Sequence, residues 1–158
     1  MSAVLTSPSV ERVRDALARA GLKPAIVELP GAARTAKAAA EYLGCEVGQI
    51  ANSLVFRAEA SDQHLLVMSS GAKRVDVARL AALVGEPVGK ADADFVRSQT
   101  GFAIGGVPPV GHGLTPYVEK SLAAYSELWA AAGHPHTVFR LTYDELVRIT
   151  RGAESELA

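Results

Sequence analysis

Apolar residues recur along the chain with two different periods, one typical of helices and the other typical of strands. Val10, Val13 and Leu17 repeat at helical spacing after Ser7-Pro8. This pattern predicts a helix with Ser7 as N-cap and Pro8 at its first position. We expect Gly21 to end it, because glycine is favoured just beyond a helix C-terminus.

Further helices are predicted where capping residues precede apolar residues at helical spacing. Thr142 and Glu145 form a capping box that opens a final helix running to about Thr150. The tail from Gly152 to Ala158 is expected to fray. The other predicted helices span residues 35–43, 76–85 and 92–99, with Asp76 and Asp92 as the caps of the second and third.

Short apolar runs between polar turns predict the strands, at residues 25–29, 53–56, 64–68, 128–131 and 137–140. A polar tip at residues 59–63 joins the second and third of these runs into a hairpin. A turn at residues 133–136 joins the last two in the same way. Strands mixed with helices in no strict alternation favour an α+β fold around a mostly antiparallel sheet.

Composition narrows the class of protein. The chain has 158 residues, of which 49% are hydrophobic and 21% are charged, and these values are typical of one globular domain. The formal net charge of −1 argues against bulk affinity for nucleic acid, although a local basic patch remains compatible with it. A single cysteine, Cys45, excludes an internal disulfide and fits a reducing compartment. Without a signal peptide or a long apolar run, we expect a cytoplasmic protein with no membrane partner.

One loop, residues 100–113, combines features that a connector rarely needs together. Gly105 and Gly106 remove two side chains after an apolar run, so another group can approach the backbone closely. Pro108 and Pro109 then fix two φ angles and stiffen the loop. His112 follows between two glycines. The loop suits recognition of a small polar group by backbone atoms, yet residue types alone favour an ordinary structural turn.

Common catalytic motifs are missing from the sequence. His134 and His136 flank a proline but have no cysteine partner, so a metal site is disfavoured. The chain has no nucleophile elbow, no phosphate-binding P-loop and no dinucleotide fingerprint. The residues themselves therefore indicate an α+β domain with a backbone-rich pocket, and they name no reaction.

Four segments together resemble the YbaK/ProX family, the free-standing relatives of the editing domain inserted in bacterial prolyl-tRNA synthetases. These segments read RTAKAAAEYLGCEVGQIANSLVF, SGAKRVDVARLAALVG, TGFAIGGVPPVGH and WAAAGHPHTVFRLTYDELVRIT, and they cover roughly residues 34–150 in the family's order. The third segment carries the family's G-x-x-x-P as Gly105 to Pro109 and is the most specific.

The resemblance implies a compact α+β domain over residues 1–158, with a core of about 8–150 and a mixed, barrel-like central sheet. Members hydrolyse the ester of a wrongly charged aminoacyl-tRNA without metal, cofactor or protein nucleophile. In that mechanism the substrate's own ribose hydroxyl assists the attack of water. The pocket receives the aminoacyl group and the terminal adenosine, and the G-x-x-x-P loop contacts the aminoacyl end through its backbone. Preorganised backbone dipoles can supply much of the required lowering of the barrier.

One position departs from the family pattern. Asn52 stands where characterised deacylases have a lysine, directly before the predicted strand 53–56. An asparagine can orient water or hold a carbonyl, but it brings no charge. Lys73, Arg34 or His112 would have to supply that charge. Two hypotheses therefore stay open, a deacylase with altered pocket chemistry and a module that binds aminoacyl-adenosine, or the tRNA end, without turnover.

The candidate site residues follow from this resemblance. Asn52 is predicted to orient the substrate, with Gly105, Gly106 and Pro109 as the backbone surface at the ester. His112 is predicted as a polar wall, and Thr35 and Ser70 as weaker pocket candidates. Lys73 and Arg74 are predicted to contact the tRNA 3′ end. The predicted partners are aminoacyl-tRNA and an aminoacyl-tRNA synthetase, and the oligomeric state is left open.

Overall fold

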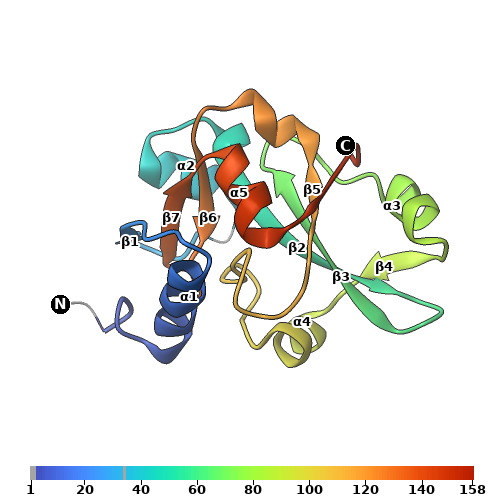
Figure 1. The fold of residues 1–158 in the computed structure, drawn as a ribbon, viewed down its shortest axis with the longest axis horizontal. Helices are drawn as coiled ribbons and strands as arrows, with labels where there is room; N and C mark the ends of the chain where they lie inside the picture. The colour runs from blue at the N-terminus through green and yellow to red at the C-terminus, as the bar shows by residue number, and fades with distance from the viewer. Residues whose placement is uncertain (1–2, 34) are drawn as a thin grey trace.

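The computed structural model describes residues 3–33 and 35–158. Within these residues it contains five α-helices around one mixed sheet of eight strands (Figure 1). The chain order is α1 (Pro8–Arg19), β1 (Ile26–Glu28), α2 (Ala36–Leu43), the 3-10 helix η1 (Val47–Gln49), β2 (Ile50–Ala58), β3 (Gln63–Ser70), α3 (Val77–Val84), β4 (Val88–Lys90), α4 (Ala93–Thr100), β5 (Tyr117–Glu119), the 3-10 helix η2 (Lys120–Ala124), β6 (Leu128–Ala131), β7 (Thr137–Leu141), α5 (Tyr143–Thr150) and β8 (Ala153–Ser155).

Strand β2 is the centre of the sheet. It pairs antiparallel with β3 along most of its length and with β4 at its end, from Phe56 to Ala58, and it pairs parallel with β6 at Ile50 and Ala51. The described strands run in the order β1-β7-β6-β2-β3-β5-β8, with β4 on a side branch. Four of these strand pairs are antiparallel and three are parallel. The predicted α+β class with a mixed, mostly antiparallel sheet is confirmed.

Local signals placed most helices correctly. Ser7 caps α1 with Pro8 in its first turn, although the Ser7 side chain makes no capping hydrogen bond. Asp76 and Asp92 accept hydrogen bonds from backbone N–H groups at the starts of α3 and α4. Thr142 and Glu145 form the predicted capping box of α5.

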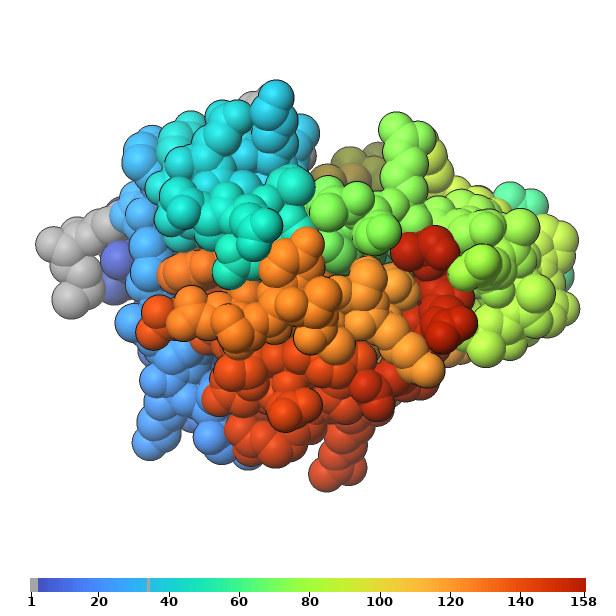
Figure 2. All heavy atoms as spheres, turned by 90° about the horizontal axis from the view of Figure 1, so that it is seen from above, coloured from blue at the N-terminus to red at the C-terminus, as the bar shows by residue number. Residues whose placement is uncertain are grey.

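The end of the chain does not fray as predicted. Strand β8 pairs parallel with β5, and Leu157 is only 2% exposed between the sheet and α3. In Figure 2 this end (red) lies between the segment near residue 120 (orange) and α3 (green). The backbone N–H of Leu157 donates to the buried carboxylate of Glu119. Burial would raise the pKa of Glu119, but N–H groups of Ser121 and Leu157 offset it and lower the pKa.

Three apolar clusters hold the sheet between its helices. The largest places α1 and α5 against the sheet, with Phe102 and Phe139 among its fully buried side chains. A second lies under α3, and the third packs Ala39 and Ala40 of α2 against Ile50. Because alanines cover this third cluster, α2 lies close to the start of β2 and leaves room for a small cavity beside it.

Candidate functional site

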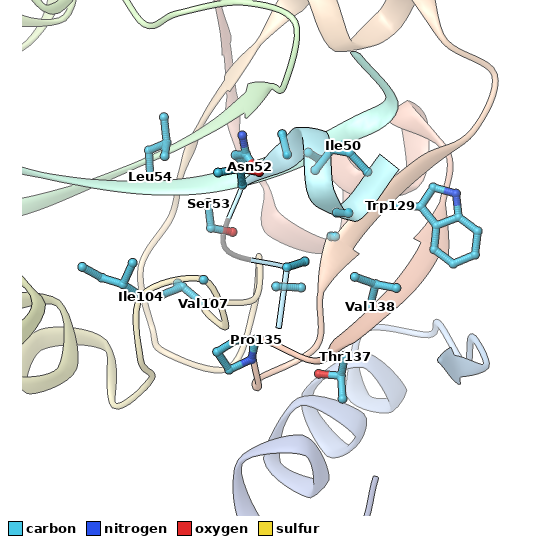
Figure 3. A pocket seen from close by; sticks show the side chains of 18 residues that line it. Ile50, Asn52, Ser53, Leu54, Ile104, Val107, Trp129, Pro135, Thr137 and Val138 are labelled. Atoms are coloured by element: carbon cyan, nitrogen blue, oxygen red, sulfur yellow. The ribbon is translucent and has the colours of Figure 1, made fainter. Parts of the chain in front are cut away.

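A cavity of about 190 Å³ opens where α2, β2, the β6–β7 hairpin and the glycine-proline loop meet (Figure 3). Its floor is the start of β2, from Ile50 to Leu54. Trp129 and Val138 stand at one end, and Leu54 and Ile104 stand at the opposite end. No charged side chain is found among the described residues that line it.

Asn52 is the most available polar group of this cavity. Its backbone pairs with Ser69 in the β2–β3 ladder, which fixes the position of its Cα. Its side-chain amide lines the cavity and has no hydrogen-bond partner within the described part of the chain. A half-buried amide with free donors and an acceptor can orient a carbonyl or a water molecule.

Other polar side chains of the cavity are already engaged. The Thr35 hydroxyl accepts the N–H of Ala38 at 3.1 Å as the N-cap of α2. Thr137, which is 1% exposed, donates to the carbonyl of His134 at 2.9 Å. The Ser53 hydroxyl lies 3.3 Å from the thioether sulfur of Met68, a weak acceptor. These groups shape the cavity more than they offer free bonds to a ligand.

The glycine-proline loop forms the opposite wall, and its glycines have different tasks. A Cβ on Gly106 would lie 3.0 Å from the backbone of His134, so this glycine lets the loop lie directly on the β6–β7 turn. The N–H of Gly106 donates to the carbonyl of Ala103 at 2.9 Å. Gly105 has a φ of +86° and lines the cavity, and its N–H has no partner among the described residues.

His112 does not line this cavity. Its Nε2 donates to the carbonyl of Pro108 at 2.8 Å, and its Nδ1 accepts the N–H of Leu114 at 3.1 Å. The ring packs edge-on against Phe102. Burial lowers the pKa of His112, the hydrogen bond to Pro108 opposes this shift, and the charge of His64 adds to it. The neutral ring therefore ties Pro108 to Leu114 across the second half of the loop.

The structure brings together some of the predicted site residues and separates others. Asn52, Thr35 and Gly105 line one cavity, while Gly106 and Pro109 support its wall from behind as buried residues. Ser70 is buried and donates to the carbonyl of Gly48 at 2.8 Å, outside the lining. Lys73 and Arg74 are exposed beyond the end of β3, and Arg34 lies outside the described residues.

Several lining residues were not predicted from the sequence. Ser53, Ile104, Pro135 and Thr137 come from three separate segments, and Trp129 is half-buried with one side on the cavity. The strand predicted next to Asn52 indicates that successive side chains there point to opposite faces of the sheet. It could not indicate which face borders a cavity.

No group of three or more His, Cys, Asp or Glu residues that could hold a metal ion occurs in the part of the chain described. His134 and His136 do lie together, with ring centroids 5.1 Å apart. No helix among residues 3–33 and 35–158 is long and apolar enough to cross a membrane.

Fold and cavity together define a small α+β domain whose site is built from backbone and neutral side chains. Residues 31–149 match the model of the aminoacyl-tRNA editing domain, so the chain belongs to that family. The resemblance to YbaK/ProX proteins is confirmed, and editing is the activity of the family.

Individual relatives agree with this assignment. The uncharacterized protein YwhH of Bacillus subtilis (strain 168) is 32% identical over 123 residues, which cover 77% of this chain and 78% of YwhH. A crystal structure described as a candidate trans-editing enzyme for prolyl tRNA synthetase is 46% identical, with a TM-score of 0.88 over 96% of this chain and 97% of that one. The hypothetical protein APE2540 is 25% identical, with a TM-score of 0.85 over 92% and 98% of the two chains.

Proposed function

We propose that this protein is a trans-acting deacylase that hydrolyses the ester of a tRNA carrying a small, wrongly attached amino acid. Water adds to the ester carbonyl, the bond to the ribose oxygen breaks, and the products are the free amino acid and an intact ribose hydroxyl. The observation that carries the proposal is the small cavity, whose neutral lining includes both Asn52 and Gly105; neither the Asn52 amide nor the Gly105 N–H has a hydrogen-bond partner among the described residues.

The size of the cavity supports a small substrate. About 190 Å³ is enclosed between Trp129, Val138 and the alanines of α2, which leaves little room beyond a short side chain. Apolar walls discriminate between neighbouring amino acids by only about 10–200-fold for each methylene group. We therefore expect a preference among small amino acids instead of strict selection of one.

The proposed chemistry depends on positioning. The ribose hydroxyl next to the ester takes part in activating water, so the protein supplies no nucleophile. Asn52 would hold the carbonyl or the attacking water, and the N–H of Gly105 would donate to the oxygen that becomes negative. Gly106, whose own N–H is bonded to Ala103, would act by holding Gly105 in place.

The direct test is the hydrolysis of tRNAs charged with alanine, cysteine, serine or threonine by the purified protein. We expect release well above the spontaneous rate for at least one of them. The Asn52→Ala variant should lower this activity by about 10- to 100-fold. Spontaneous rates for the whole panel, under conditions where the protein is folded, would refute the deacylase.

A non-catalytic binding module is the second candidate, and one observation favours it. Asn52 stands where the family has a lysine, and the described residues that line the cavity include no cationic side chain that could replace the charge of that lysine. The Asn52→Lys variant distinguishes the two candidate functions. If the natural protein binds the tRNA end without turnover and this variant hydrolyses it, the site has kept its ligand and lost its reaction.

The predicted contact of Lys73 and Arg74 with the tRNA end has its own test. Both side chains are exposed, so their substitution should not disturb folding. In Lys73→Ala/Arg74→Ala we expect weaker tRNA binding and a salt dependence whose slope falls by about two phosphate contacts. Unchanged affinity and slope would assign tRNA recognition elsewhere, for example to a synthetase partner.

A further inference from the structure

Helix α1 supports the glycine-proline loop from behind, although it precedes the residues that match the family model. Its backbone lies directly against the β6–β7 turn, since a Cβ on Gly133 would lie 2.7 Å from the carbonyl oxygen of Ser9. In Figure 1, α1 (dark blue) lies next to the ends of β6 and β7. The same helix contacts the loop, and it does so on both sides of that loop.

Arg12 makes the contact at the start of the loop. Its guanidinium carbon lies 4.4 Å from the centre of the Phe102 ring, well within the range of about 6 Å for a cation–π contact. Its Nη2 donates to the carbonyl of Gly101 in a long hydrogen bond of 3.4 Å. A Cβ on Gly101 would lie 2.8 Å from Nη1 of the same guanidinium. The absence of a side chain at Gly101 therefore lets Arg12 lie against the backbone of the loop.

The second side of the loop meets α1 one turn further along the helix. A Cβ on Gly111 would lie 3.6 Å from the Cβ of Ala16 and 3.8 Å from the Phe102 ring. The Phe102 ring also packs edge-on against His112, with ring centroids 6.4 Å apart. His112 in turn bonds to the second half of the loop through both ring nitrogens. Arg12, Phe102 and His112 thus form one stack that runs from α1 through both halves of the loop.

Arg12 is suited to this contact because nothing else engages it. It is exposed, and no carboxylate pairs with it in the part of the chain described. Phe102 is only 1% exposed, so its ring has a fixed place under the guanidinium. Gly105 follows Phe102 by three residues, and a shift of the ring would therefore be felt at the cavity.

We propose that Arg12 is a positioning residue, which fixes Phe102 and through that ring holds Gly105 at the cavity. The effect on rate rests on the proposed function, because it is the N–H of Gly105 that would donate to the ester oxygen. The effect on the loop does not rest on it and can be measured without substrate. Since a displacement of about 1 Å can cost a large factor in rate, a contact outside the cavity can influence the reaction.

Amide hydrogen exchange tests the effect on the loop. The reporters are the N–H of Gly106, which donates to Ala103, and the N–H of Leu114, which donates to His112. Arg12→Met keeps a long apolar side chain and removes the cation and the donor. We expect both amides to exchange about three- to tenfold faster in this variant, while amides of the β2–β3 ladder keep their natural rates.

Steady-state kinetics test the effect on the reaction. Arg12→Met should lower kcat by about three- to tenfold and leave KM within about twofold, because the loop acts on the reacting group and not on the rest of the tRNA. Arg12→Lys should recover part of the loss, because it keeps a cation for the ring and lacks the planar fork. Arg19→Met, at an exposed arginine of the same helix, is the matched control and should behave as the natural protein does.

A double-mutant cycle tests whether Arg12 acts through the ring. Phe102→Leu keeps an apolar side chain and removes the aromatic face. In that background Arg12→Met should change the exchange of the two reporter amides less than it does in the natural protein. An equal change in both backgrounds would mean that the ring does not transmit the effect, and would overturn the proposal.

Two other results would also overturn it. One is natural exchange together with natural kcat in Arg12→Met, which would leave the deacylase in place and reject the role of Arg12. The other is a raised KM with unchanged kcat, which would make Arg12 a contact to tRNA. The expected exchange pattern in a protein that hydrolyses no aminoacyl-tRNA would retain the hold of Arg12 on the loop and reject the deacylase.

Discussion

The two walls of the central cavity differ in how they use polar groups. The strand wall, β2 from Ile50 to Leu54, includes Asn52, whose amide has no hydrogen-bond partner among the described residues. The loop wall, residues 104–107, offers no polar side chain at all. It is fixed from behind by the contact of Gly106 with His134 and by the two hydrogen bonds of His112.

This difference separates chemistry from positioning. A ladder of backbone hydrogen bonds already holds β2, so a polar side chain on it can stay free for a ligand. The loop has no such ladder and must be fixed by close packing, which is why it contains glycine and proline where a strand would carry side chains. Changes in the loop wall should therefore alter stability and activity together, whereas changes at Asn52 should alter activity alone.

The largest effect is expected from Gly106→Val. Its Cβ would lie 3.0 Å from backbone atoms of His134, which cannot move aside as a flexible side chain could. Overpacking of this kind costs about 1–3 kcal/mol in the free energy of unfolding. Displacing Gly105 by about 1 Å should lower the deacylation rate by about 100-fold. Thermal unfolding and single-turnover hydrolysis measure the two effects.

A graded control accompanies this variant. Gly106→Ala adds only the Cβ. Its losses of stability and of activity should therefore both be smaller than those of Gly106→Val. If Gly106→Val has the same melting temperature and the same rate of hydrolysis as the natural protein, the loop does not depend on this contact. The assignment of positioning to the loop wall would then be wrong.

A smaller effect, confined to activity, is expected from Asn52→Ala. One preorganised donor removed from a reacting oxygen costs about 100- to 1,000-fold in rate when it is fully used, and a half-exposed amide should contribute less, about 10- to 100-fold. Stability should stay unchanged, because the amide has no partner among the described residues. The exposed Gln63→Ala at the far end of the same hairpin is the matched control. A lower melting temperature in Asn52→Ala would show that the amide is structural.

Sequence reasoning succeeded where the signal was local. The caps of α3, α4 and α5 each depend on residues a few positions apart, and so does the β2–β3 hairpin with its polar tip. Strands β4, β5 and β8 were missed because each has three residues and exists only through pairing with distant strands. Leu157 is a single apolar residue in a polar tail, and no periodicity announces that it fills a gap under α3.

The cavity was predictable only in part, for a related reason. Gly105 and Gly106 were recognised as places where another group approaches the backbone, and the structure identifies that group as the β6–β7 turn. Which residues surround Asn52 depends on four segments meeting in space, so Thr137 and Pro135 carried no signal. His112 was expected at the cavity because a titratable residue ends the loop. Its ring instead bonds to the loop itself, since the backbone of Pro108 and Leu114 needs partners.

The smallest effect concerns pH and tests the loop wall alone. The pKa of His112 is lowered in the folded protein from its usual 6.5, so the fold holds the neutral ring. As the pH falls below about 6.5, the unfolded chain takes up a proton first, and stability is lost until the pH reaches the lower folded pKa. His112→Gln can donate to Pro108 and accept from Leu114 without titrating. Chemical unfolding should therefore show a shallower loss of stability below that pH in the variant than in the natural protein.

His134, whose pKa is also lowered by burial and by His136, contributes equally to both proteins and cancels in the difference. Identical pH profiles would mean that His112 does not hold the loop through its neutral form.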